Sequence, residues 1–281
     1  SLFNKVFEPF GVQVRYVDIC DLEAVRVAIA EEQPGCVVME TISNPLLRVG
    51  QLDRIAELSR QAGAALVVDN TFATPLLVRP LDHGANLVVH SLTKYLAGHG
   101  DVLGGSITGD RESIATVRSL SRIYGPVLGP FEAYLTMRGI KTFPLRVERQ
   151  NKNACRLASW LAHHPKVERV NFPADPKHPD TATVKRLFPE GLFGAMLSFE
   201  LKDAGKEQVF TWMDSLSMIV RATSLGDVHT MVLYPAMSSH REISPKMRER
   251  LGIGDNLVRI STGIEAVEDI IADLERGFAA I

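Results

Sequence analysis

The chain has 281 residues, of which 46% are hydrophobic and 23% are charged, which is ordinary for a globular protein large enough to bury one or two cores. With 31 basic against 33 acidic residues and a net charge of -2, it lacks the electrostatic pattern of proteins that bind nucleic acid or an anionic membrane surface. We therefore expect a small-molecule ligand or a protein partner.

Three cysteines, Cys20, Cys36 and Cys155, lie far apart in the sequence and form no C-x-x-C pair. Neither a disulfide framework nor a zinc site is therefore expected, and a reducing, cytoplasmic setting is the default. The longest apolar runs have the length of strands and are broken by charge or glycine, so we expect no membrane span and no signal peptide. The opening residues, SLFNKVFEPFG, contain no initiator Met and read like the middle of a domain, so we expect that an N-terminal segment has been lost.

Apolar runs alternate with a helical pattern in the first half of the chain, which is typical of βαβ units and a mainly parallel sheet. The predicted strands are 35–40, 64–70, 86–91 and 101–109. Between the first two, residues 49–63 place apolar side chains on one helical face and end at Gly63, a favourable C-terminal cap. Ligands bind at the carboxyl ends of such strands, which here carry the segments 40–44, 69–71 and 91–94.

A long amphipathic helix is predicted over 137–164, where an Arg- and Glu-rich pattern links two regions of the chain. Four candidate strands of a smaller α/β sheet follow, at 169–174, 195–201, 218–226 and 256–265. A closing helix is predicted at 267–281. The economical interpretation is two domains, 1–140 and 141–281, with this helix as the link.

Lys94 and Asp69 each follow an apolar strand. A free lysine has a pKa of about 10.4, so at neutral pH it is a poor nucleophile unless its surroundings lower that pKa or it forms a Schiff base. Taken alone, each residue has an ordinary interpretation, a solvated loop lysine and a turn-forming aspartate. Together with the hydroxyls of Ser91 and Thr93, which can hold a phosphate, they match the protein's contribution to pyridoxal phosphate chemistry.

The segment VVDNTFATPLLVRPLDHGANLVVHSLTKYLAGHGDVLGG (67–105) resembles the core of the pyridoxal-phosphate enzymes of cysteine and methionine metabolism. This family includes cystathionine γ-synthase, cystathionine γ-lyase, methionine γ-lyase and O-acetylhomoserine sulfhydrylase. The resemblance continues in order through ETISNP (40–45), SLGD (224–227), YPAMSSH (234–240) and LVRISTGIEAVEDIIADL (257–274). It implies an α/β protein of fold type I, in which a mainly parallel large domain binds pyridoxal 5′-phosphate and a smaller α/β domain forms the C-terminal part.

The resemblance implies that Lys94 is the catalytic residue, which holds the cofactor covalently and then moves protons between carbons of the substrate. Asp69 is implied to pair with the pyridine nitrogen and to keep it protonated, so that the ring can accept electrons. The resemblance also implies that the hydroxyls of Ser91 and Thr93 bind the phosphate of the cofactor. Thr71 is implied to line the cofactor ring, and Asn44 to hydrogen-bond its 3-hydroxyl.

Substrate recognition is implied to lie in the second domain. Arg259 resembles the arginine that binds the α-carboxylate, for which its planar fork of donors is suited, and Ser224 a residue beside that carboxylate. Relatives that handle cystathionine typically carry a glutamate before this serine, whereas this chain has Thr223. A neutral side chain suits an uncharged γ-substituent, so we expect γ-elimination on methionine, which gives 2-oxobutanoate, ammonia and methanethiol.

Cystathionine γ-lyase or γ-synthase and O-acetylhomoserine sulfhydrylase are the alternatives, followed by an inert relative that only binds other proteins. The family assembles as homotetramers, built as dimers of dimers. Its members also carry, upstream of this start, a tyrosine that stacks on the ring, a phosphate-binding loop and an N-terminal arm, none of which is found in residues 1–281. No metal site is expected, because the histidines lack ligand spacing.

Overall fold

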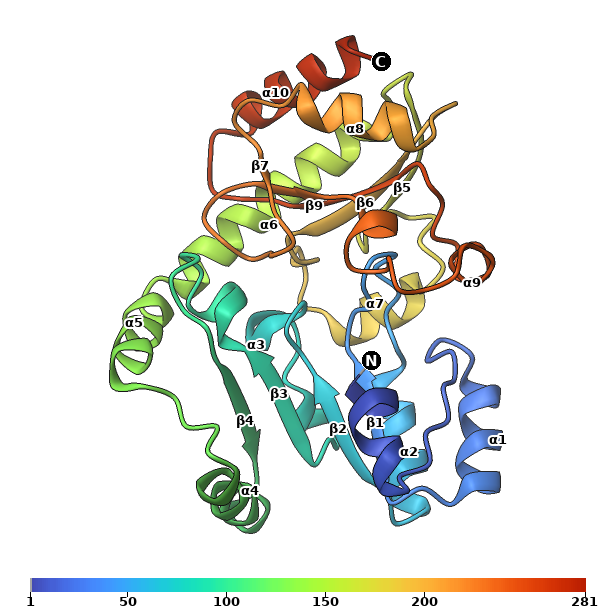
Figure 1. Cartoon of the computed structure of the whole chain (residues 1–281), viewed down its shortest axis with the longest axis vertical. Helices are drawn as coiled ribbons and strands as arrows, with labels where there is room; N and C mark the ends of the chain where they lie inside the picture. The colour runs from blue at the N-terminus through green and yellow to red at the C-terminus, as the bar shows by residue number, and fades with distance from the viewer. Residues whose placement is uncertain (1) are drawn as a thin grey trace.

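The computed structural model describes residues 2–281 as two β-sheets with helices packed around them (Figure 1). The first sheet has the strand order β1-β2-β3-β4, and its strands are β1 (Cys36–Glu40), β2 (Ala65–Asp69), β3 (Leu87–Ser91) and β4 (Gly105–Gly109). The pairs β1/β2 and β2/β3 are parallel, whereas β4 pairs antiparallel to β3. The prediction of a mainly parallel sheet is confirmed, and each strand lies within its predicted range.

Five helices accompany this sheet, namely α1 (Leu22–Glu32), α2 (Leu52–Gln61), α3 (Thr74–Leu77), α4 (Arg111–Tyr124) and α5 (Pro130–Ile140). The predicted helix between the first two strands is α2, which buries Leu52, Ile55 and Ala56 against the sheet. It ends just before Gly63, whose φ of 71° lies in the left-handed region that favours glycine.

The long linking helix is α6 (Phe143–Leu161), which runs from the region of α5 to the second sheet (Figure 1). It begins later than predicted, because residues 137–140 complete α5 instead. Pro144 lies in the first turn of α6, where a missing N–H costs no helical hydrogen bond. The boundary between domains at residue 140 stays a prediction.

The second sheet has the order β5-β6-β9-β8-β7, with β5 (Val167–Asn171), β6 (Met196–Leu201), β7 (Val220–Arg221), β8 (Met231–Leu233) and β9 (Leu257–Ser261). Only the β7/β8 pair is parallel. The strand β8 was not predicted, because three residues are too few to show an alternating pattern.

The remaining helices are α7 (Thr181–Leu187), α8 (Lys206–Asp214), α9 (Pro245–Arg250) and α10 (Val267–Ala279). The helices α6, α8 and α10 lie together over the second sheet (Figure 1), and the rings of Phe199, Trp212 and Phe278 pack between them. Of the helices within residues 2–281, none combines the length and apolarity needed to cross a bilayer.

Candidate active site

The residues predicted from the sequence lie in two places. In the first sheet they lie at the ends of strands, and in the second they lie on β9 and in the loop between β7 and β8. Asp69 ends β2, and Lys94 lies in a single π-helical turn, Leu92–Leu96, directly after β3. Asn44 lies in the loop 41–50 after β1, and Arg259 is the central residue of β9. Parallel strands bring their carboxyl ends to one edge, so the first three residues approach each other by topology alone.

Lys94 and Ser224 meet although 130 residues separate them in the sequence. The lysine Nζ donates to the serine Oγ at 2.8 Å, and Arg259 Nη2 donates to the carbonyl of Ser224 at 3.0 Å. Arg259 Nη1 also donates to Asn44 Oδ1 at 3.0 Å. The structure thus joins four of the predicted residues into one hydrogen-bonded chain across the two sheets.

The Lys94 amine lies in a setting that favours its neutral form. Burial lowers the pKa of Lys94, and the positive charge of Arg259 lowers it further. Burial also lowers the pKa of Arg259 to about 10, so this guanidinium is still charged at neutral pH. Within residues 2–281 the buried Arg259 Nε has no hydrogen-bond partner, which leaves a donor for an incoming oxygen.

Asp69, Thr71 and Ser91 form a second chain of contacts. The Thr71 N–H donates to Asp69 Oδ1 at 3.0 Å, and the Ser91 N–H donates to Thr71 Oγ1 at 3.0 Å. No partner is found among residues 2–281 for Asp69 Oδ2 or for the Ser91 hydroxyl. One carboxylate oxygen and one hydroxyl therefore stay available to a ligand.

A family model described as "Cys/Met metabolism PLP-dependent enzyme" matches residues 1–279. The chain belongs to this family. Its cofactor is therefore pyridoxal phosphate, and it is an enzyme of cysteine and methionine metabolism.

Relatives within the family are named for several activities. An L-methionine gamma-lyase of Fusobacterium nucleatum subsp. polymorphum is 42% identical over 275 residues, covering 97% of this chain and 69% of the relative. An O-succinylhomoserine sulfhydrylase of Pseudomonas aeruginosa is 39% identical, and the match covers 100% of this chain and 69% of the relative. The crystal structure of cystathionine gamma-lyase from Lactobacillus plantarum complexed with L-serine matches with a TM-score of 0.94 at 38% identity. The match covers 100% of this chain and 72% of the solved chain.

The free groups fit the cofactor of the Cys/Met metabolism family. Among the described residues 2–281, an amine for covalent attachment, a carboxylate oxygen for a protonated ring nitrogen and a hydroxyl for a phosphate have no competing partner, apart from the Lys94 contact to Ser224. Thr93 is more engaged, since its Oγ1 accepts from the Gly104 N–H at 3.0 Å and lies 3.4 Å from the Gly104 carbonyl. The second contact is long, so the Thr93 hydroxyl can turn to another acceptor.

Thr223 is the predicted residue that the structure does not tie to the others. Its side chain is exposed and has no hydrogen bond among the described residues, although it directly precedes Ser224. Asn70, by contrast, was not singled out from the sequence and supports the strand ends, because it is buried between Thr41, the Val78 carbonyl and His90. An amide directly after a buried strand was the available signal.

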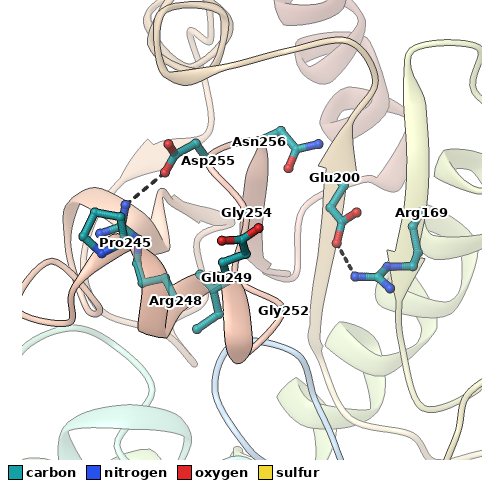
Figure 2. A pocket seen from close by; sticks show the side chains of 10 residues that line it. Arg169, Glu200, Pro245, Arg248, Glu249, Gly252, Gly254, Asp255 and Asn256 are labelled. Carbon is teal, nitrogen blue, oxygen red and sulfur yellow. Dashed lines mark hydrogen bonds and ion pairs between the residues drawn. The ribbon is translucent and has the colours of Figure 1, made fainter.

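A hollow of about 430 Å³ lies apart from these residues, beside α9 and the edge of β5 and β6 (Figure 2). Four of its charged side chains are paired with each other, Arg169 with Glu200 and Arg248 with Asp255. None of the predicted site residues lines it. The hollow is therefore separate from the strand-end residues, which stay the candidate site.

Proposed function

We propose that this enzyme is a carbon–sulfur lyase of the trans-sulfuration type that removes the γ-substituent of a sulfur amino acid, and that methionine is its preferred substrate. Methionine and water then give 2-oxobutanoate, ammonia and methanethiol. The main support is the 2.8 Å contact from Lys94 Nζ to Ser224 Oγ. Because Arg259 donates to the carbonyl of the same serine, this contact sets an amine beside a cation suited to a carboxylate.

Arg259 is proposed to bind the α-carboxylate of the substrate. Its Nη1 and Nη2 are oriented by Asn44 and Ser224, and its free Nε is a further donor. Only 3% of the residue is exposed, so a carboxylate would be bound with little competition from water. A substrate held in this way presents its α-carbon towards the Lys94 side of the site.

Lys94 is proposed to move the substrate's protons. The lowered pKa leaves more of the amine unprotonated at neutral pH than in a free lysine, so it can take the proton from the α-carbon and return one elsewhere. When bound, pyridoxal phosphate supplies a ring that accepts the electron pair released at the α-carbon. Asp69 Oδ2 is proposed to face the ring nitrogen and to favour its protonated form.

Thr223 supports methionine within this class. A neutral, exposed threonine beside Ser224 offers no charge to the distal ammonium of cystathionine, and the methylthio group of methionine carries none. The sulfhydrylase and cystathionine γ-lyase relatives are nearly as similar as the methionine γ-lyase. Cystathionine γ-lyase or γ-synthase activity and O-acetylhomoserine sulfhydrylation are therefore the alternatives, and a catalytically inert relative comes last.

A comparison of kcat/KM tests the proposal, using methionine, cystathionine, and O-acetylhomoserine with sulfide. We expect methionine to be preferred by at least about tenfold, which is a typical discrimination by one pocket contact. Thr223→Glu should raise kcat/KM for cystathionine relative to methionine by a similar factor. Thr223→Gln introduces a side chain of the same size as glutamate without its charge, and should not raise this ratio. A strong wild-type preference for cystathionine, or no turnover of any of the three, would contradict the proposal.

A homotetramer built as a dimer of dimers is proposed for the whole enzyme. The support in this chain is a set of apolar side chains on α4 and on α5 that no described residue covers, and α4 has no buried residue at all. The set includes Leu120, Ile123, Tyr124, Phe131, Tyr134 and Met137. Patches of this kind mark contacts with other chains.

A further inference from the structure

Arg146, on the linking helix α6, is buried beside the catalytic lysine, with only 5% of the residue exposed. Its guanidinium donates to four acceptors, which are the carbonyls of Tyr95 (3.0 Å), Leu96 (3.3 Å) and Gly139 (3.0 Å) and the hydroxyl of Thr142 (3.2 Å). Two of these acceptors are the carbonyls that directly follow Lys94. Arg146 therefore joins the lysine's own peptide segment to the corner between α5 and α6.

The Lys94 turn depends on such outside donors. Lys94 has φ -97° and ψ -135°, so its backbone is not helical although it lies inside the turn Leu92–Leu96. Carbonyls that do not accept regular helical hydrogen bonds need other donors when they are buried. Arg146 supplies these donors for the two residues after the lysine.

Two glycines allow the Lys94 turn and the helix corner to approach this closely. A Cβ added at Gly98, which has φ 70°, would lie 1.8 Å from Arg146 Nη1. A Cβ at Gly139 would lie 2.3 Å from the Ala97 carbonyl oxygen. Any side chain at either position would push the guanidinium or the helix corner away from the segment that carries Lys94.

The charge of Arg146 is not explained by an ion pair. Among residues 2–281 it has no carboxylate within ion-pair distance, and burial lowers its pKa, with only partial compensation by the charge of Asp227. A buried cation without a partner is a poor source of stability. A guanidinium does, however, offer five donors in a rigid fork that can hold carbonyls from separate elements at once, whereas an apolar side chain offers none and a lysine offers three donors on a single nitrogen.

The same helix face also holds the loop that carries Ser224. One turn beyond Arg146, Gln150 Nε2 donates to the Asp227 carbonyl at 2.6 Å. The Val228 N–H donates to the Gly98 carbonyl at 3.1 Å, so this loop and the Lys94 turn are also joined to each other. The contact between Lys94 and Ser224 is thus made by two segments that α6 holds in place.

We propose that Arg146 is a positioning residue, which fixes the peptide bearing Lys94 against α6 and so sets the direction of the lysine amine towards the cofactor and Ser224. It does not touch the substrate. This inference rests on the proposed role of Lys94 but not on which sulfur amino acid is used.

The test measures how fast pyridoxal phosphate becomes attached to Lys94 in the complete enzyme after the cofactor has been removed. Attachment is trapped with borohydride and quantified by mass spectrometry of the Lys94 peptide, and circular dichroism of the bound cofactor reports how the ring is held. For Arg146→Met we expect attachment to slow by about 10- to 100-fold, because a misdirected group of this kind loses roughly that factor. Arg146→Lys should retain part of the rate, since it keeps the charge but not the fork.

Asn153→Leu is the matched control on the same helix. Asn153 is 2% exposed and donates to the carbonyls of Gly263 and Glu265 at 2.9 Å each, away from the Lys94 turn. We expect it to lower the melting temperature while attachment stays within about twofold of wild type, as for distant sites. If Arg146→Met slows attachment no more than this control, Arg146 is only structural and the inference is wrong.

Lys94→Ala separates this inference from the proposed function. Here the readout is the total cofactor that borohydride traps on any lysine of the chain. If this total is lost in Lys94→Ala and the rate of attachment is unchanged in Arg146→Met, the Arg146 inference alone fails. If Lys94→Ala traps as much cofactor on another lysine as the wild type traps in total, the proposed role of Lys94 fails, and with it the inference that rests on it.

Discussion

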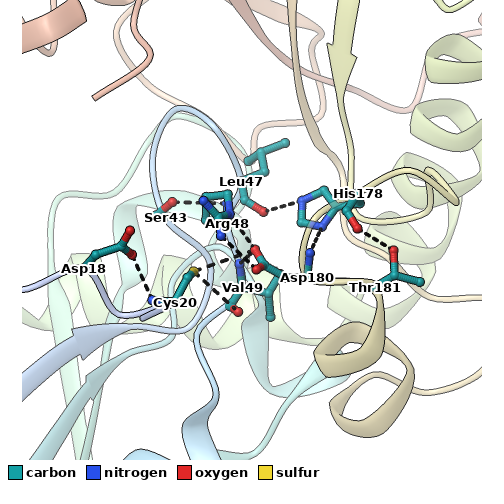
Figure 3. Close-up of polar contacts among 9 residues, drawn as sticks. All are labelled: Asp18, Cys20, Ser43, Leu47, Arg48, Val49, His178, Asp180 and Thr181. Carbon is teal, nitrogen blue, oxygen red and sulfur yellow. Dashed lines mark hydrogen bonds and ion pairs between the residues drawn. The ribbon is translucent and has the colours of Figure 1, made fainter. Parts of the chain in front are cut away.

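At the scale of single residues, the Asp180 carboxylate joins segments that lie far apart in the sequence (Figure 3). Its Oδ2 accepts from Arg48 Nε at 2.7 Å and from the Val49 N–H at 2.9 Å, and its Oδ1 accepts from Arg48 Nη2 at 3.0 Å. The Cys20 thiol lies 3.7 Å from Oδ2, and its pKa is raised to about 12, first by burial and then by the Asp180 charge. Asp180 thereby holds the loop 41–50, which carries Asn44, against the start of α7.

This carboxyl also links stability to pH. Burial alone would raise the pKa of Asp180, but the hydrogen bonds from Arg48 and from the Val49 N–H outweigh it and keep that pKa below its ordinary value. A carboxyl with a lower pKa in the folded than in the unfolded chain stabilises the fold above its unfolded pKa, about 3.9 for aspartate. That contribution is lost as the pH falls through the folded pKa.

For Asp180→Asn we therefore expect the free energy of unfolding at pH 7 to fall by about 1–2 kcal/mol, around the lower end of the range for hydrogen bonds to charged groups, because Arg48 is partly exposed. Urea unfolding at pH values from 7 to 3 measures this free energy, and the difference between variant and wild type should narrow below about pH 4. Asp53→Asn is the control, because it removes the charge from the more exposed ion pair with Arg186. It should lower the free energy of unfolding by at most about 1 kcal/mol. A gap that stays constant down to pH 3 would refute this account of Asp180.

At the scale of helices and strands, the exposed apolar side chains of α4 and α5 are the feature that residues 2–281 leave without a partner. Phe131 and Tyr134 are 66% and 60% exposed, and they lie three residues apart, so they share one side of α5. Covering such side chains in an interface stabilises an assembly by about 1.5–3 kcal/mol for each large residue. Contact with a further copy of the chain is the proposal that accounts for them.

Light scattering on the complete enzyme tests this assembly, and we expect the mass of four chains. Phe131→Asp should shift the mass towards smaller species, because an interface core disfavours charge. Phe10→Asp, which changes a phenylalanine on another segment that is 84% exposed against 66% for Phe131, should leave the mass unchanged. A wild-type mass of one chain, or equal effects of both substitutions, would rule out this role for α5.

At the scale of the whole molecule, the parts that local patterns determine were predictable from the sequence. The strands β1, β2 and β3 were found because apolar runs bounded by turn residues mark buried parallel strands, and α2 because its apolar side chains recur with the helical period. The predicted start of the linking helix at residue 137 was wrong, since a continuous helical pattern does not show where one helix ends and the next begins. The short strand β8 is set by pairing with β9, which no local pattern records.

The site was predictable only in part. Topology brings Asp69 and Lys94 to one sheet edge, whereas the contact of Lys94 with Ser224 and Arg259 depends on how the two sheets meet. Those residues were identified through the family resemblance and not from local pattern. Arg146 was missed, although a charged residue between Phe143 and Gln150 on the buried face of α6 is a signal that the helical period could have shown.

The most direct test of the central claim is to locate the cofactor on the chain. The complete enzyme is loaded with pyridoxal phosphate, reduced with borohydride and digested, and the modified peptide is identified by mass spectrometry. We predict a single modified lysine, Lys94, in the peptide that contains HSLTKYLAGHG. Modification of a different lysine, or none when the cofactor is fully bound, would contradict the claim that Lys94 is the catalytic residue of this enzyme.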